Sequence, residues 1–128
     1  MAMSAVTTDV CVALVDDDES LCRSMARMLR AAGVRSVSYP SAEGFLADRL
    51  RPEFDCLVLD IQLGGISGVE LARQLADSGS TTPVIFITAH DEAELRGQAL
   101  RAGCAAYLRK SDPGETVLEA LHRAIRQP

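Results

Sequence analysis

Four polar groups of this sequence each follow a short apolar run. They are the acids DDDE at 16–19, the lone carboxylate Asp60, the hydroxyl of Thr88 and the ammonium of Lys110. Apolar runs of four to eight residues are typical of strands buried on both faces of a parallel sheet. The carboxyl ends of parallel strands meet at one edge, where open α/β sheets place their ligands. We therefore expect the four groups to lie together.

Together these groups could hold a metal ion and accept a phosphoryl group. Clustered carboxylates that are partly shielded from water need protonation or a cation, and oxygen ligands with room for water suit Mg²⁺. Lys110 adds a second positive charge beside Asp60, and Thr88 adds a hydroxyl donor. Such surroundings favour phosphoryl transfer, because they balance the charge on the phosphoryl oxygens. Asp60 is the predicted acceptor, and Mg²⁺ is the predicted cofactor.

Each of these residues also has an interpretation without chemistry. A strand-end aspartate such as Asp60 often only caps a turn, and acids favour the N-terminus of a helix. Asp18 fits that helix-start role. Thr88 alone would be an ordinary strand-end residue, so the chemical interpretation depends on the convergence of all the groups.

Alternating strands and helices must position these side chains. The apolar runs predict strands at 10–15, 34–39, 56–59, 83–87 and 104–108. Helical spacing and capping residues predict five helices. The first includes 21–29 and ends at Gly33, and the next three cover about 41–50, 67–77 and 91–102. The last begins with Asp112 as its N-cap and extends past Ile125. Five strand–helix units with short links indicate an α/β fold with a doubly wound parallel sheet and helices on both faces.

Length and charge limit the class of protein. With 128 residues the chain has the size of one compact domain, for which we expect a loose tail at 1–9 and one folded unit at 10–128. A net charge of −5 disfavours direct nucleic-acid binding. No stretch approaches the ~20 apolar residues of a membrane span, and no secretion signal is present, so we expect a cytoplasmic protein without membrane contact.

Four motifs in a fixed order give the sequence a family resemblance. They are VDDDE at 15–19, LDIQLGGISG at 59–68, ITAH at 87–90 and AGCAAYLRK at 102–110. The chain from 10 to 126 resembles a response-regulator receiver domain of two-component signalling, of the FixJ/NarL-like kind. The resemblance implies a flavodoxin-like, five-stranded parallel sheet in the order 2-1-3-4-5.

The resemblance also implies a metal site and an acceptor. In this family the acceptor, here Asp60, takes a phosphoryl group from a histidine kinase. The implied ligands of Mg²⁺ are the side chains of Asp16, Asp17 and Asp60 and the backbone carbonyl of Gln62. The choice of Asp16 and Asp17 from the acidic run rests on alignment.

Other residues are implied to sense or transmit phosphorylation. Lys110 faces the phosphate, and Thr88 and Tyr107 shift together as a switch, with a static core aromatic as the alternative for Tyr107. The partner is a sensor histidine kinase. Arg96, Arg101 and Arg109 indicate either a homodimer through the face made by the fourth helix, fifth strand and fifth helix, or an ordinary solvated surface.

The sequence departs from the family pattern at two prolines. Gly64, followed by Gly65, replaces the proline four residues after the acceptor, which predicts a looser loop. Ser111 replaces the proline that follows the lysine through a cis bond. Because a non-proline cis peptide costs ~3–4 kcal/mol, we predict a trans Lys110–Ser111 bond and a shifted loop there.

The expected function is a phosphoacceptor domain that relays a conformational switch to a partner or output domain, such as one in transcription regulation. It is not an enzyme for free substrates, since it catalyses only its own phosphorylation and slow dephosphorylation. A haloacid dehalogenase-type phosphatase would want an acid where Gln62 stands, and a nucleotide binder would want glycines in place of DDDES at 16–20. The main alternative is a non-phosphorylated receiver that acts as a docking module.

Overall fold

The computed structural model describes residues 9–89 and 92–126, so the tail expected at 1–9 lies outside it except for Asp9, as do His90 and the expected helix start at 91. Strands and helices alternate along the chain. They are β1 (Val10–Val15), α1 (Glu19–Ala31), β2 (Val34–Tyr39), α2 (Ala42–Ala47), β3 (Cys56–Asp60), α3 (Gly68–Asp77), β4 (Val84–Thr88), α4 (Ala93–Arg101), β5 (Ala106–Arg109) and α5 (Gly114–Arg126). Within the described ranges, no helix is long and apolar enough to cross a bilayer.

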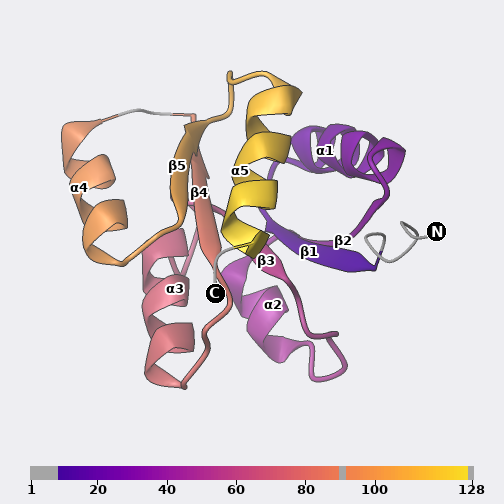
Figure 1. Cartoon of the computed structure of the whole chain (residues 1–128). Coiled ribbons are helices and arrows are strands. Elements are labelled where there is room, and N and C mark those ends of the chain that lie inside the picture. The colour runs from indigo at the N-terminus through magenta and orange to yellow at the C-terminus, as the bar shows by residue number, and fades with distance from the viewer. Residues whose placement is uncertain (1–8, 90–91, 127–128) are drawn as a thin grey trace.

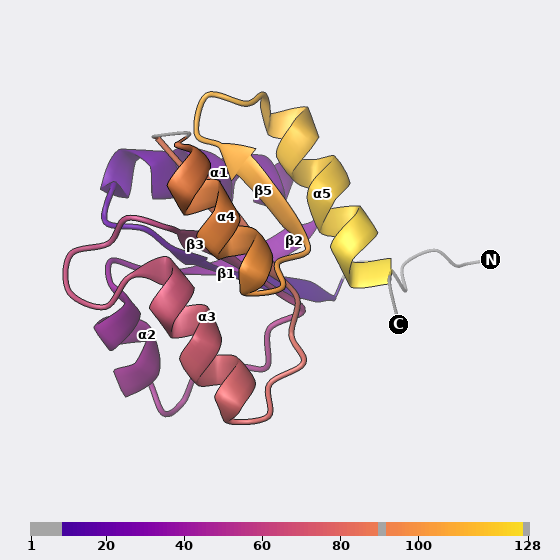
Figure 2. The ribbon, with the colours of Figure 1, turned by 90° about the vertical axis from the view of Figure 1, so that its left-hand side faces the viewer.

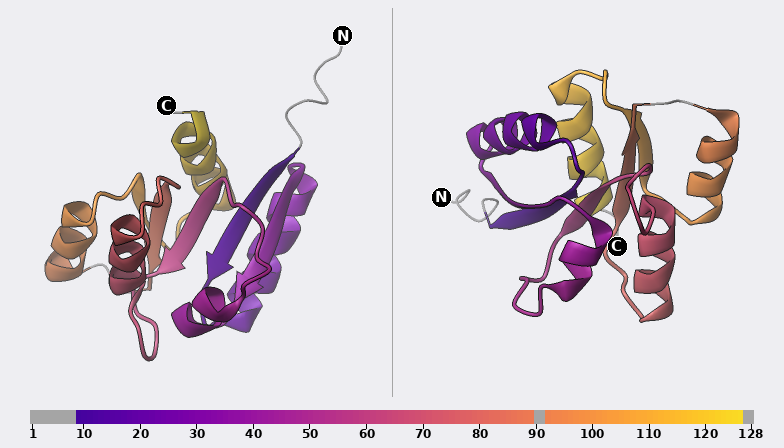
Figure 3. Two further views of the ribbon diagram at one scale, coloured as in Figure 1. Left: turned by 90° about the horizontal axis from the view of Figure 1, so that it is seen from below. Right: turned by 180° about the vertical axis from the view of Figure 1, so that it is seen from behind.

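The strands form one parallel sheet between two layers of helices. The strand order is β2-β1-β3-β4-β5, which confirms the predicted fold class and order. Helices α1 and α5 lie on one side of the sheet, and α2, α3 and α4 lie on the other (Figure 1). Figure 2 looks onto the layer of α3 and α4, and Figure 3 shows the layers from below and from behind.

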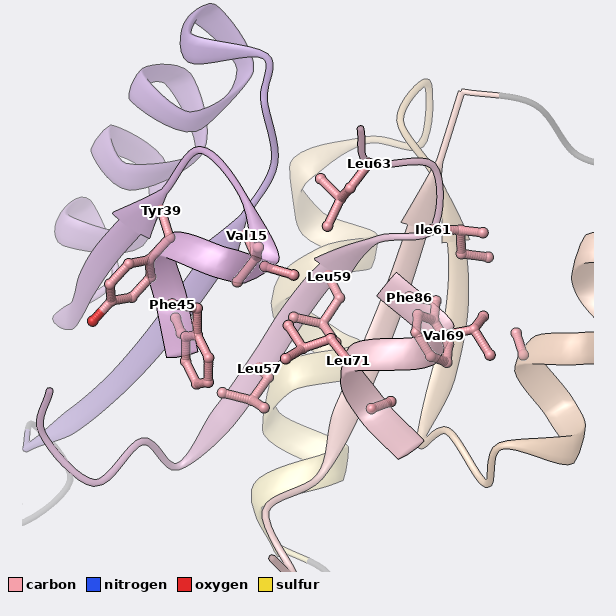
Figure 4. Packing of buried hydrophobic residues seen from close by; sticks show 14 residues of the cluster. Val15, Tyr39, Phe45, Leu57, Leu59, Ile61, Leu63, Val69, Leu71 and Phe86 are labelled. Atoms are coloured by element: carbon pink, nitrogen blue, oxygen red, sulfur yellow. The ribbon is translucent and has the colours of Figure 1, made fainter. Parts of the chain in front are cut away.

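Burial on both faces explains the continuous apolar runs of the central strands. All five residues of β3 are buried. Leu57 and Leu59 point into the core under α2, α3 and α4, where they meet Val69, Leu71 and Phe86 (Figure 4). Cys56 and Val58 point into the second core, under α1 and α5. Successive side chains of β3 therefore enter opposite cores, and every position before Asp60 is apolar because both faces are covered.

Capping side chains fix where several helices begin. The carboxylate of Asp18 accepts from the N–H of Leu21, the hydroxyl of Ser41 from Gly44, and the hydroxyl of Ser67 from Glu70. These residues have the short polar side chains that reach the free N–H groups of a first turn. The predicted helix stop at Gly33 is confirmed by its φ of +82°.

Helix α2 is shorter than predicted. The helix expected over 41–50 ends at Ala47. The guanidinium of Arg51 donates to the carbonyls of Phe45 and Asp48 and stacks 4.6 Å above the Phe45 ring, which closes the helix early. Leu50 is left 94% exposed.

The last strand and the last helix begin later than predicted. The strand expected over 104–108 is β5, Ala106–Arg109. The predicted N-cap Asp112 is wrong, because its carboxylate turns back to accept from the N–H of Arg109 at 2.9 Å. Helix α5 starts at Gly114, and the carbonyl of Pro113 accepts from Thr116 at 3.0 Å. The Lys110–Ser111 bond is trans, as predicted.

The two glycines after β3 differ in what they demand of the backbone. Gly65 has a φ of +81°, a conformation that L side chains rarely adopt, and a Cβ there would overlap Glu43 Oε2. Gly64 has no positive φ, and nothing lies within 4 Å of where its Cβ would be. Only the second glycine of the pair is required by the fold.

We expect opposite results from one alanine substitution at each of these glycines. Gly65→Ala should lower the free energy of unfolding by about 1–2 kcal/mol, because alanine resists the positive φ. Gly64→Ala should leave it unchanged or raise it by up to about 1 kcal/mol, because alanine restricts the unfolded chain. Urea unfolding followed by circular dichroism measures both, and equal effects at the two positions would contradict the assignment.

Candidate functional site

Strand register brings the chemical side chains to one edge of the sheet. Val15 pairs with Leu59, so Asp16 and Asp60 follow on neighbouring strands. Thr88 pairs with Arg109, and the N–H of Lys110 donates to the Thr88 carbonyl at 2.8 Å. Residues from the beginning, middle and end of the chain thus meet where the strands end.

The ammonium of Lys110 lies between two carboxylates. Its Nζ is 3.0 Å from Asp60 Oδ2, and it is 3.1 Å from Asp16 Oδ1 and 3.0 Å from Asp16 Oδ2. Burial lowers the pKa of Lys110, but the hydrogen bonds from its nitrogen to the two carboxylates outweigh this and raise the pKa above its ordinary value. The lysine therefore stays charged.

Asp60 is a buried carboxylate with few donors. Only 3% of the residue is exposed. Oδ2 accepts from Lys110, and Oδ1 accepts from the backbone N–H of Gln62 at 3.0 Å. Burial raises the pKa of Asp60, the hydrogen bond from Lys110 opposes the rise, and the charge of Asp16 adds to it. Without a further cation, the ionised form of Asp60 is destabilised.

The acidic residues offer a set of oxygen ligands. Carboxylate oxygens of Asp16, Asp17 and Asp60 lie within 4.8 Å of one another. Asp16 is buried, whereas Asp17 is exposed and gives the group a side open to solvent. Asp16 Oδ2 lies near Lys110 Nζ but accepts no hydrogen bond within the described ranges, so a ligand position is left over. A hard divalent cation suits this donor set.

The third acid of the run has a different task. Asp18 caps α1 through the N–H of Leu21 at 3.1 Å, and its own N–H donates to Asp16 Oδ1 at 2.9 Å. Its carboxylate is therefore engaged with the helix. The helix-capping contact gives a physical reason to leave Asp18 out of the candidate metal ligands, a choice for which the sequence alone offers only alignment.

Gln62 lies at the start of the loop that follows β3. Its side chain is exposed, and its N–H is the one bonded to Asp60. The side chain of Thr88 is completely buried at the end of β4. Tyr107 in β5 pairs with Phe86 in β4, so it points to the same side of the sheet as Phe86 and Thr88, toward α4. Its ring lies 5.5 Å below the guanidinium of Arg96.

Two contacts around the acceptor were not predicted. A Cβ on Gly68 would overlap the Asp60 carbonyl, so glycine lets α3 start directly against the acceptor strand. The carboxylate of Glu43 in α2 accepts from the N–H of Ile66 at 2.9 Å. The motif LDIQLGGISG could have indicated the close approach at Gly68, but nothing in the local sequence singles out Glu43.

Comparison with known proteins agrees with this arrangement. The family model "response regulator receiver domain" matches residues 12–122. The chain is similar to the crystal structure of FixJ-N, with a TM-score of 0.85 and 34% identity, over 94% of this chain and 96% of that one. The fold and the family resemblance noted in the sequence are therefore confirmed.

Two curated relatives are longer than this chain. The chain is 31% identical over 113 residues to the response regulator protein TmoT of Ectopseudomonas mendocina, which covers 88% of this chain and 51% of TmoT. It is 36% identical over 117 residues to the transcriptional regulatory protein FixJ of Rhizobium meliloti, which covers 91% of this chain and 57% of FixJ. The chain thus spans about half the length of the curated relatives it matches. Because the family model extends over most of the chain, the chain belongs to the response-regulator receiver domains of two-component signalling systems.

Proposed function

We propose that Asp60 accepts a phosphoryl group from the phosphohistidine of a sensor histidine kinase. The observation that carries this proposal is the ammonium of Lys110 held within 3.1 Å of both Asp16 and Asp60. In the reaction, the P–N bond of phosphohistidine breaks and an oxygen of Asp60 forms the new O–P bond. The imidazole keeps the electron pair of the broken bond and takes a proton from water.

Residues of the chain would hold and neutralise the group. Lys110 would exchange its bond to Asp60 Oδ2 for one to a phosphoryl oxygen, while its bond to Asp16 keeps the ammonium in place. The Thr88 hydroxyl would donate to a second oxygen. Catalysis of this kind is mainly positioning and charge neutralisation. The domain is therefore expected to modify itself and not to process free substrates.

Mg²⁺ is the cofactor we assign to this reaction. The side chains of Asp16, Asp17 and Asp60 and the carbonyl of Gln62 would hold it. The buried Asp16 Oδ2 with no hydrogen bond and the carboxylate set within 4.8 Å support this. When bound, Mg²⁺ supplies positive charge to the phosphoryl oxygens.

Phosphorylation would change the surface formed by α4 and β5, and a binding partner would recognise that change. Thr88 and Tyr107 point to this face from neighbouring strands, which supports their proposed role as a coupled switch. We propose that a partner, an output domain or a second copy of the chain binds this face, in a cytoplasmic protein. The relatives named as transcriptional regulators support an output in gene control for a longer protein.

Mass spectrometry of the intact protein tests the acceptor. Incubation with acetyl phosphate and Mg²⁺ should add one group of about 80 Da to the wild type. Asp60→Asn should gain none, because an amide is not a nucleophile of this kind. Asp18→Asn is the matched control and should be modified like the wild type. If the wild type gains no group under these conditions, the domain is a docking module.

The charge at Asp60 should also reduce the stability of the metal-free protein. Since its pKa is raised, the stability linked to its protonation is present below the ordinary pKa of aspartate and is lost as pH rises through the raised value. At pH 7, Asp60→Asn should therefore raise the stability by about 1 kcal/mol, or the Tm by about 4 °C. The difference should shrink toward pH 4. A lower Tm for Asp60→Asn at pH 7 would contradict this.

Mg²⁺ should stabilise the wild type through the same carboxylates. At about 100 times the Kd, a bound cation adds about 2.7 kcal/mol to the free energy of unfolding. Asp16→Asn should lose most of this increase, because it removes a buried ligand. Thermal melts with Mg²⁺ and with EDTA measure it, and an equal gain in Asp16→Asn would rule out Asp16 as a ligand.

A further inference from the structure

A carboxylate from α2 reaches the loop that follows the acceptor strand. Oε2 of Glu43 accepts from the backbone N–H of Ile66 at 2.9 Å. Accepting this bond lowers the pKa of Glu43, so the carboxylate is ionised at neutral pH. The bond links residues 23 positions apart and ties the loop 62–66 to α2, which packs on the same face of the sheet as α3.

The loop backbone is shaped to meet this carboxylate. Gly65 takes a φ of +81°, and a Cβ at that position would overlap Glu43 Oε2. The carboxylate therefore rests against bare backbone. A side chain at Gly65 would force Glu43 away from the Ile66 N–H.

The helix α2, which carries Glu43, is held firmly in the fold. Its neighbours in α2, Ala42 and Phe45, are buried in the core. The hydroxyl of Ser41 caps the start of the helix at 3.0 Å, and the guanidinium of Arg51 binds carbonyls at its end. Because side chains bind both ends of α2 and its buried residues pack in the core, the backbone of Glu43 is held in a fixed position relative to the sheet.

The segment held by Glu43 connects two fixed points next to the acceptor. Before the segment, the N–H of Ile61 donates to the Ile87 carbonyl at 3.1 Å. After it, the N–H of Gly68 donates to the Ile61 carbonyl at 3.1 Å. Between these points lie Gln62 and the pair Gly64–Gly65. Glycine has more backbone freedom than other residues, so the segment can move most at this pair. The bond at Ile66 restrains this freedom.

We infer that Glu43 is a positioning residue for phosphorylation, which holds the loop 62–66 so that the Gln62 carbonyl and the Asp60 carboxylate keep their relative places. The inference rests on the proposed function. It assigns to the α2 helix a part in the reaction that its sequence does not suggest. It also gives a reason for glycine at position 65, where the carboxylate lies against the backbone.

The test compares Glu43→Ala, Glu43→Gln and Glu70→Ala with the wild type. Glutamine keeps an oxygen that can accept from Ile66 but removes the charge. Glu70, an exposed acid in the first turn of α3, controls for the loss of one negative charge nearby. The measurements are the rate of modification by acetyl phosphate with Mg²⁺, the Mg²⁺ affinity, the hydrogen exchange of the Ile66 amide, and the Tm.

We expect Glu43→Ala to exchange the Ile66 amide about tenfold faster and to be phosphorylated about five times more slowly, from the loss of one hydrogen bond. Mg²⁺ affinity should fall by a similar factor while the Tm stays close to that of the wild type. Glu43→Gln should recover most of the rate, and Glu70→Ala should match the wild type.

Two results would overturn the inference. One is a wild-type rate of phosphorylation in Glu43→Ala, and the other is an equal loss of rate in Glu70→Ala, which would indicate a general charge effect. A wild type that takes no phosphoryl group while binding Mg²⁺ normally would instead overturn the proposed function, and the inference with it. The wild-type measurement thus separates the two failures.

Discussion

The structure depends on one lysine that neutralises two buried carboxylates. Asp16 and Asp60 lie side by side at the ends of β1 and β3, and two unpaired negative charges in such a place would be costly. Lys110 is 94 residues from Asp16 in sequence and extends from the end of β5, past β4, to both acids. Its long, flexible stem makes this span possible. The strand order thus keeps Lys110 within reach of both acids.

Much of this arrangement could be predicted because it follows from periodicity. Uninterrupted apolar runs indicate strands covered on both faces, and the polar residue that ends each run must lie at the common edge. Asp60 and Lys110 could be placed together on that basis alone. The caps at Asp18 and Ser67 were also predictable, since the donor and acceptor are only three residues apart.

The parts that could not be predicted involve side chains that bind distant or unexpected backbone groups. Arg51 ends α2 by folding back onto its carbonyls, and Asp112 binds Arg109 in preference to the helix that follows it. The bond from the Ile66 N–H to the Glu43 carboxylate forms only after the sheet has placed α2 beside the acceptor loop. Glutamate in a first helical turn has the same sequence pattern whether it faces water or a neighbouring backbone amide.

The aromatic residues have a consequence for optical measurements. The chain has no tryptophan and only two tyrosines. The hydroxyl of Tyr39 is bonded to Asp48 at 2.7 Å, and burial, together with this bond, raises its pKa to about 12. Tyr39 is thus fixed within the aromatic cluster beside α2, while Tyr107 lies on the α4 side of β5. If phosphorylation moves Tyr107, as proposed above, ultraviolet emission or absorbance would report that movement without an added label.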